Sequence, residues 1–385
     1  MSLSSRREYL SVMRNRYQAA KLRAEKSQIL NEIVSTAGFN RKYAIRLLSH
    51  ARATRRRICR RRLKRYREAL PAIQVVWEAL DYPCAERLHP VLLATAELLH
   101  RHGELPLTDL IRDQLQKMSR STLARRLAEL PTPKVRRAAL RSRPAHGIQA
   151  AVPISRYAWD ETRPGALEID LVEHNGGSSA GHYAYTLDVV DVVTGWSARR
   201  AVLGRSQAGI FTALQWIVER WPFPIWALHS DNGSEFICAF LLQFSQQHSY
   251  QFSRSRPYKK NDNAHVEQKN RQLVREVVGY SRHDTPHEVA WLNQVYECLD
   301  PYANLYLPSR KVIGKARNGA HVTKTYDIAQ TPFRRSVAAG VLDPVTQASL
   351  EAQILAHSPL ALHRRLERLL SNSPQDPSLL TTAAD

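Results

Sequence analysis

The sequence predicts an α/β protein: a helical N-terminal region with helix-turn-helix patterns, then a mixed five-stranded sheet flanked by helices, then a mostly helical C-terminal tail. Three observations predict this class. Residues 1–145 follow helical apolar spacing, residues 166–203 hold three apolar runs separated by glycine-containing turns, and residues 206–299 alternate between helical and short apolar segments. Strands that come first, followed by alternating helices and strands, indicate a mixed sheet covered by helices.

Residues 1–70 contain the first helix-turn-helix pattern. An apolar helical stretch from Ile29 to Val34 is followed by Gly38 and by a second short helix that runs to Leu48. This order is typical of DNA-binding motifs, although a plain helical hairpin would give the same pattern. The cations on or at the start of the second helix, where a recognition helix would meet DNA, are Arg41, Lys42 and Arg46.

A run of a single charge sign follows at residues 52–67, RATRRRICRRRLKRYR, in which ten of sixteen residues are Arg or Lys and none is acidic. A solvated face normally mixes signs, so this run predicts a segment that follows DNA phosphates. We expect Arg56, Arg60 and Arg61 to take part, without reading the base sequence.

Residues 71–145 form a second predicted helical domain, whose end LTDLIRDQLQKMSRSTLARRLAEL has the pattern of another helix-turn-helix. Ser119 or Ser121 would cap its last helix. The cations of this helix that would be available to DNA are Arg120, Arg125 and Arg126. The alternative is one helical domain with a single reading helix. Prolines and basic residues at 131–165 indicate a linker, with a domain boundary near 145–155.

The composition favours a nucleic-acid partner. The 56 Lys and Arg residues outnumber 35 Asp and Glu residues, which gives a formal charge of +21. Such a surplus repels itself unless a polyanion neutralises it, although a generally basic cytosolic protein is the plain alternative. Four scattered cysteines without a CxxC pair exclude a zinc finger or disulfide framework, and neither a signal peptide nor a membrane span is found. We therefore expect a cytoplasmic, nucleoid-associated protein without membrane contact.

The sheet domain is predicted at residues 155–305. Its strands are expected at 166–174, 182–193, 196–203, 224–229 and 250–254, and its helices at about 206–220, 234–248, 262–279 and 286–299. A loop is expected from Tyr302 to Arg310. Residues 306–385 are expected to form a partly helical extension, in which 335–371 are helical.

Three acidic residues stand out by their context. Asp170 lies inside the apolar strand LEIDLV, where a carboxylate is costly unless it binds a metal or a partner. Asp231 ends a strand at an Asn-Gly turn, and Glu267 lies at the edge of an apolar helical stripe. Three carboxylates suit hard cations, so we predict Mg²⁺ or Mn²⁺, as two ions about 3.5–4 Å apart that serve phosphodiester chemistry.

The segments LEIDL, HSDNGSEF and KKNDNAHVEQKNR resemble the DDE motif of integrase-core transposases, relatives of retroviral integrase found in bacterial insertion sequences. The 35 residues between Asp231 and Glu267 match the spacing typical of that superfamily. The resemblance covers about residues 155–305 and implies a ribonuclease-H-like fold. It also implies hydrolysis that frees a 3′-OH, and strand transfer of that 3′-OH into target DNA.

The same resemblance implies partners: double-stranded DNA, as element terminal repeats and as target, and a homodimer or higher assembly that holds two ends together. Nothing in the sequence matches the HHCC zinc domain of retroviral integrases, so zinc is not expected.

Residues beside the motif acids receive lesser roles. Asn263 would cap the helix that carries Glu267 and could touch substrate. Asp188 and Asp191 are interpreted as structural. The cations that would face phosphates near the site, unless they form a solvated basic face, are Lys259, Lys260, Lys269 and Arg271.

Two rival functions remain open at this stage. One is a ribonuclease-H-like nuclease that cleaves without joining, against which the long basic N-terminal region argues. The other is a domesticated, non-catalytic DNA-binding protein, against which the presence of all three acids argues.

Overall fold

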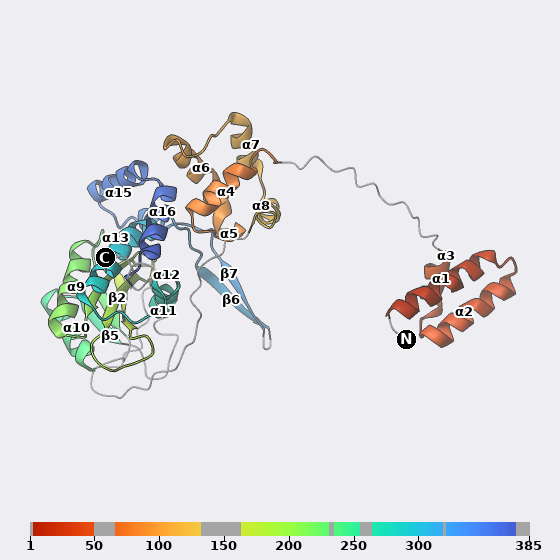
Figure 1. The fold of residues 1–385 in the computed structure, drawn as a ribbon, viewed down its shortest axis with the longest axis horizontal. Coiled ribbons are helices and arrows are strands. Elements are labelled where there is room, and N and C mark those ends of the chain that lie inside the picture. The colour runs from red at the N-terminus through yellow and green to blue at the C-terminus, as the bar shows by residue number, and fades with distance from the viewer. Residues whose placement is uncertain are drawn as a thin grey trace, which may run out of the picture. The chain divides into compact units, whose positions relative to one another are not determined.

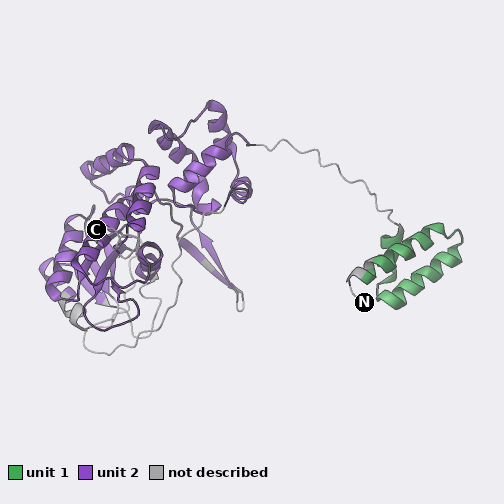
Figure 2. Ribbon diagram, in the orientation of Figure 1, with its two compact units in different colours: residues 1–65 green, residues 66–385 purple. Residues whose placement is uncertain are grey.

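A computed structural model describes residues 3–49, 66–131, 163–230, 235–254, 264–318 and 321–374. The chain divides into two compact units, residues 1–65 and 66–385 (Figure 2). The boundary predicted near 145–155 falls outside the described residues.

The first unit consists of three helices around a small apolar core. They are α1 (Leu3–Ala19), α2 (Arg23–Ala37) and α3 (Arg41–Ser49). Met13, Ile33 and Leu48 are buried between them. Gly38 ends α2 with a φ of 65°, a conformation that favours glycine, and its N–H donates to the carbonyl of Val34 at 3.1 Å. The predicted helix, glycine turn and short helix are confirmed, and α1 precedes them.

The second unit begins with short helices. These are α4 (Leu70–Ala79), α5 (Ala85–Leu88), η1 (His89–Val91), α6 (Leu92–Arg101), α7 (Asp109–Lys117) and α8 (Arg120–Leu127). Ser119 caps α8, since its hydroxyl accepts from the N–H of Thr122 at 3.3 Å. These helices share a buried core with the sheet and with the C-terminal helices, so they belong to one compact unit with the sheet.

A five-stranded mixed sheet forms the centre of this unit (Figure 1). Its strands are β1 (Ala166–His174), β2 (Ala184–Asp191), β3 (Ser197–Leu203), β4 (Ala227–Ser230) and β5 (Gln251–Arg254). Their order is β3-β2-β1-β4-β5, with β1, β2 and β3 antiparallel and with β4 and β5 parallel to β1. The predicted mixed sheet and all five predicted strand positions are confirmed.

Helices cover both faces of this sheet. Arg200 of β3 lies over the ring of Trp216 in α9 (Gln207–Glu219), at 4.5 Å from the ring centroid. The guanidinium of the neighbouring residue Arg199 donates to the carboxylate of Asp300 in α13 (Pro286–Leu305). Because successive strand residues point to opposite faces, α9 and α13 lie on opposite sides. The other helices of this domain are α10 (Glu235–Gln247), α11 (Ala264–Lys269), the π-helical segment η2 (Asn270–Arg275) and α12 (Glu276–Val278).

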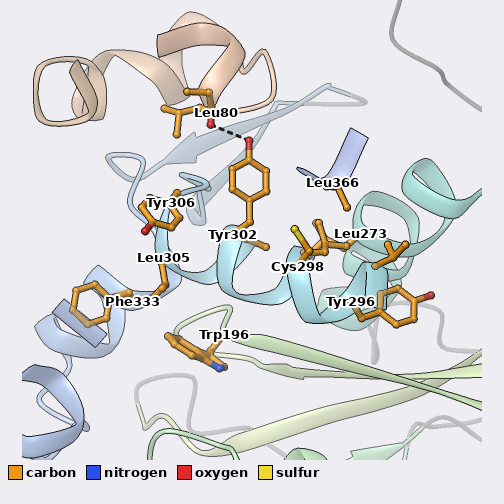
Figure 3. Packing of buried hydrophobic residues seen from close by; sticks show 14 of the residues in the cluster. Leu80, Trp196, Leu273, Tyr296, Cys298, Tyr302, Leu305, Tyr306, Phe333 and Leu366 are labelled. Carbon is orange, nitrogen blue, oxygen red and sulfur yellow. Dashed lines mark hydrogen bonds between the residues drawn. The ribbon is translucent and has the colours of Figure 1, made fainter. Parts of the chain in front are cut away.

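The predicted start of the loop at Tyr302 is wrong, because α13 continues through Pro301 to Leu305 and the loop begins only after it. Tertiary contacts outweigh the cost of an internal proline here. The hydroxyl of buried Tyr302 donates to the carbonyl of Ala79 at 3.0 Å and ties α13 to α4 (Figure 3).

Side chains of α13 form hydrogen bonds with the backbone edge of the outer strand β3. Asn304 accepts from the N–H of Ser197 at 3.0 Å and donates to its carbonyl at 2.7 Å. Asn293 bonds the N–H and carbonyl of Ala201 in the same way, at 2.8 and 3.1 Å. Backbone groups that an edge strand would offer to another chain are therefore satisfied within the molecule.

Asn304→Ala is expected to lower the free energy of unfolding by about 2–4 kcal/mol, because two backbone groups of buried Ser197 lose their partners. Urea titration would measure the change. Asn372→Ala, an exposed asparagine after α16, serves as the control and should change stability by less than about 0.5 kcal/mol. Equal stability of the two variants would contradict this role of Asn304.

The C-terminal extension holds a hairpin and three helices. Strands β6 (Val312–Asn318) and β7 (His321–Tyr326) pair with each other alone, in a region where the sequence pattern predicts no strand. The helices α14 (Pro332–Ala338), α15 (Pro344–Ala356) and α16 (Pro359–Ser371) confirm the predicted helical character. Among the described helices, none is both long and apolar enough to cross a membrane.

Candidate active site

Two of the three predicted acids lie on elements that pack together. Asp170 is in the central strand β1, and Glu267 is in α11, which packs against β1 and β2. Asp231 lies outside the described residues. Its predecessor Ser230 ends β4 and is paired with Ile169, the residue before Asp170. Asp170 directly follows Ile169 and Asp231 directly follows Ser230, so the two predicted aspartates come next after a pair of adjacent strand residues.

Hydrogen bonds fix the carboxylate of Asp170. Asn270 Nδ2 donates to Asp170 Oδ2 at 2.5 Å, and the N–H of Leu171 donates to Oδ1 at 2.8 Å. Two residues earlier on the same face, buried Glu168 accepts from the N–H of Val266 at 2.8 Å. The start of α11 and the start of η2 are therefore each tied to β1. Sequence reasoning missed Asn270 and Glu168.

Glu267 lies beside these ties. It directly follows buried Val266 and precedes Asn270 by three residues, so Glu267 and Asn270 are neighbours on the helix surface. Its side chain is exposed, which puts the carboxylate at the rim of the contact between helix and sheet. Glu267 thus directly follows Val266, the first buried residue of the predicted apolar stripe.

The helix changes form at Asn270. Instead of one helix over 262–279, the described part consists of α11, the π-helical segment η2 and α12. Leu273 and Val274 are buried in η2. A π-helical segment shifts the register of the side chains that follow it and is often found at functional sites.

A row of buried charges crosses the sheet next to Asp170. Asp170 is paired with Asp188 on β2, and Asp188 with Arg199 on β3. Arg199 Nε lies 3.3 Å from Asp188 Oδ1, and Arg199 also donates to the carboxylate of Asp300 in α13. The side chains of Asp188 and Arg199 are fully buried. Asp188 is held by an internal counterion, which agrees with its interpretation as structural.

Burial dominates the protonation of this row. It raises the pKa of Asp188 and of Asp300 to about 6, while the Arg199 guanidinium opposes both shifts. Burial, followed by repulsion from Arg199, lowers the pKa of half-buried Lys269 to about 8. Lys269 adds charge to this internal row, whereas exposed Arg271 pairs with Glu276 at 3.2 Å.

Asp191 has the structural role expected for it. Its carboxylate accepts from the N–H of Thr194 at 2.5 Å, from the Thr194 hydroxyl at 2.6 Å and from the N–H of Gly165 at 2.7 Å. It therefore holds the turn between β2 and β3.

The donor atoms around Asp170 fit a hard divalent cation. Carboxylate oxygens are the ligands that Mg²⁺ and Mn²⁺ prefer. Asn270 Oδ1 is buried, and within the described part of the chain no group donates to it. Among the described residues, no three His, Cys, Asp or Glu side chains gather closely enough to hold a metal. Because Asp231 lies outside them, the metal site stays a prediction.

The predicted DNA-binding cations of α3 lie on its surface. Arg41, Lys42 and Arg46 are all exposed. Arg41 donates to Ser27 of α2 at 2.7 Å, and the Arg46 guanidinium lies 5.4 Å from the Tyr43 ring centroid. This leaves Lys42 and Arg46 as the outward cations of the second helix of the pair.

The cations of α8 divide in two. Arg120 and Arg125 are exposed, but the Arg126 side chain is 13% exposed and pairs with Glu129 at 3.0 Å. The Arg126 side chain thus pairs within its own segment and presents little surface to DNA. The predicted residues that lie outside the described part of the chain are Arg56, Arg60, Arg61, Lys259, Lys260 and Asn263.

No protein-family model matches the chain. A protein of Sinorhizobium fredii (strain NBRC 101917 / NGR234), named uncharacterized protein y4rM, is 35% identical to it over 341 residues, which cover 87% of this chain and 96% of that protein. The name of this relative states no activity. This identity, over almost the whole length of the relative, shows that the two proteins share a family. The chain belongs to the family of the Sinorhizobium protein y4rM.

Proposed function

We propose that this protein is a DNA transposase of the integrase-core type, which binds element ends and catalyses metal-dependent hydrolysis and strand transfer through Asp170, Asp231 and Glu267. One observation carries the proposal: α11, which bears Glu267, is tied to β1 on both sides of Glu267, and the second tie is the bond from Asn270 to Asp170. A ribonuclease-H-like fold is part of the proposal, supported by three antiparallel strands followed by parallel strands between helices.

The acids would serve as oxygen ligands. Asp170, Asp231 and Glu267 would hold Mg²⁺ or Mn²⁺, which would supply positive charge to the attacking and the leaving oxygens of the phosphodiester. The chain's own contribution is position. Asn270 fixes the orientation of the Asp170 carboxylate, and the bond from Val266 to Glu168 keeps Glu267 on the helix beside it.

The charge distribution supports DNA as the substrate. The formal charge of +21 favours a polyanionic partner, and Lys42 and Arg46 lie exposed on the second helix of a helix-turn-helix arrangement. Because transposition joins two element ends, we propose a homodimer or higher assembly on DNA, located with the bacterial nucleoid in the cytoplasm.

A joining assay tests the proposal. Purified protein would be incubated with Mg²⁺ or Mn²⁺, end-labelled DNA from the borders of its own element, and a supercoiled plasmid as target. A transposase gives 3′-OH cleavage products and labelled plasmid. A ribonuclease-H-like nuclease gives cleavage without labelled plasmid, and a non-catalytic DNA-binding protein gives neither, so either result would overturn the proposal.

Asn270→Ala is expected to slow cleavage by about 10- to 100-fold, the usual effect of removing a group that orients a metal ligand. The Mg²⁺ concentration for half-maximal cleavage should rise as well, which a merely structural role would not cause. Single-turnover cleavage over a Mg²⁺ titration measures both. Gln268→Ala, an exposed neighbour on α11, is the control. Wild-type Mg²⁺ dependence in Asn270→Ala would refute the orienting role.

A further inference from the structure

The β6–β7 hairpin projects from the second unit and is largely exposed along both strands (Figure 1). Ile313 is 66% exposed and Val322 45% exposed, and among the described strands these two pair only with each other. A two-stranded hairpin of this kind is marginally stable in water without a further surface to cover it. The ribbon therefore depends on its base, on a partner, or on both.

The base of the hairpin is firmly held. Lys311 Nζ donates to the carbonyl of Val192 at 2.6 Å and to that of Val193, just after β2. Asp327 accepts from the N–H of Lys311 at 2.7 Å and from Arg335 of α14 at 2.6 Å. The two ends of the hairpin are thus fixed to the sheet and to α14. The rest of the hairpin, which consists of β6 and β7, extends away from this base (Figure 1).

The charged residues of the hairpin are all basic. Between residues 309 and 326 the sequence SRKVIGKARNGAHVTKTY contains no acidic residue. Lys315 and Lys324 occupy directly paired positions of the two strands. Lys311 is engaged at the base, and the other cations of this segment are Arg310, Lys315, Arg317 and Lys324.

Positions that carry cations gather on one face of the ribbon. Arg317 is paired with Val322, and Lys324 and Tyr326 follow Val322 at intervals of two residues, so all four share a face. The Arg310 guanidinium lies 4.5 Å from the Tyr326 ring centroid. The opposite face carries small residues, since Gly314 is paired with Thr325 and Ala316 with Thr323. A slim ribbon with one cationic face fits the major groove of DNA.

We propose that the β6–β7 hairpin is a DNA-binding arm that contacts phosphates of duplex DNA through Arg317 and Lys324. The inference rests on the proposed function, since it assigns a further contact to the same DNA. The exposed apolar residues Ile313 and Val322 would also suit a protein partner, but a basic ribbon without a single acid favours a polyanion.

Fluorescence anisotropy with the full chain and a 30-base-pair duplex of arbitrary sequence, without divalent metal, tests the arm. The double variant Arg317→Gln/Lys324→Gln is expected to weaken binding about tenfold near physiological salt. The slope of log K against log salt should shrink by about 0.9 for each phosphate that is no longer neutralised, so by about 2 for the pair. The double variant Arg365→Gln/Arg368→Gln removes the same charge from exposed residues of α16 and should weaken binding less than about twofold.

A photo-reactive amino acid placed at Val322 tests the contact independently, because it should crosslink to the duplex. The same amino acid at Leu355, which is also exposed, should not crosslink. Equally weakened binding in the two double variants, with no crosslink at Val322, would overturn the inference. A changed oligomeric state of Arg317→Gln/Lys324→Gln in light scattering, with unchanged DNA affinity, would also overturn it in favour of a protein interface. Crosslinking at Val322 without any metal-dependent cleavage would instead defeat the proposed function and leave the arm intact.

Discussion

Asp170→Asn is expected to abolish metal-dependent DNA cleavage, with a loss of at least about a thousandfold, or about 4 kcal/mol of transition-state stabilisation. The amide keeps the shape of the side chain, and its oxygen can still accept from the N–H of Leu171. Its NH2 group replaces the oxygen to which Asn270 donates, and the negative charge that a divalent cation needs is removed. Asp231→Asn and Glu267→Gln should have effects of the same size, because the three carboxylates would share the same ions. Single-turnover cleavage of end-labelled DNA in Mg²⁺ and in Mn²⁺ measures the loss.

Two acids on or near the same elements provide matched controls. Glu173 lies on β1 but points to the other face than Asp170, since three positions separate them. Glu276 lies on the helix that follows η2 and pairs with Arg271. Glu173→Gln and Glu276→Gln should keep cleavage within about threefold of the wild type, as surface substitutions away from a site usually do. Unchanged cleavage in Asp170→Asn would refute the site, and DNA affinity equal to the wild type would show that the variants are folded.

The sheet could be predicted closely because its strands are bounded by clear signals. The apolar run 166–174 coincides with β1, and turn residues such as Gly195 separate the strands that follow. Asp170 stands out for a physical reason, since an acid inside an apolar strand must have a partner. These signals are local, which is why they are visible in the sequence alone.

The missed residues depend on contacts between distant positions. Asn270 and Asp170 are 100 positions apart, and Arg199 and Asp300 are 101 apart. The pattern of apolar and polar residues around these positions does not predict such a bond. The position of Asn270, three residues after Glu267, places both on one side of the helix and is the one signal that could have found it. The sequence predicts that Lys269 faces phosphate, whereas in the folded chain it is half-buried and its pKa responds to the charges of Arg199 and Asp188.

The hairpin has a local signal that its composition conceals. Asn318 followed by glycine, between runs rich in β-branched residues, is a strong sign of a two-stranded hairpin. The charges within KVIGKARNGAHVTKTY make both runs look unlike strands, because a strand normally has one apolar face to bury. A pair of strands without an apolar face is what an exposed DNA-binding ribbon would need, so the charges that conceal the strand pattern fit the proposed arm.

Arg199→Met is expected to cause the largest loss of stability, about 3–5 kcal/mol at neutral pH. Methionine keeps an unbranched apolar side chain but has no guanidinium, so Asp188 and Asp300 would remain in the interior without their shared counterion. Denaturant titration or the melting temperature measures it. Arg200→Met is the control, because Arg200 is the next residue of β3 and its side chain, 27% exposed, pairs with Glu297 at the surface. Its loss should be about 1 kcal/mol or less.

The pH dependence of this loss separates a charge effect from a packing effect. In the wild type burial already raises the pKa of Asp188 and Asp300 to about 6, and removal of Arg199 should raise both further. A carboxyl whose pKa is higher in the folded than in the unfolded state gives stability below about pH 4, which is lost as the pH rises through the folded pKa. Arg199→Met should therefore be closer to the wild type at pH 5, where both carboxyls are largely protonated, than at pH 8. A loss of the same size at both pH values would show that Arg199 contributes packing rather than charge.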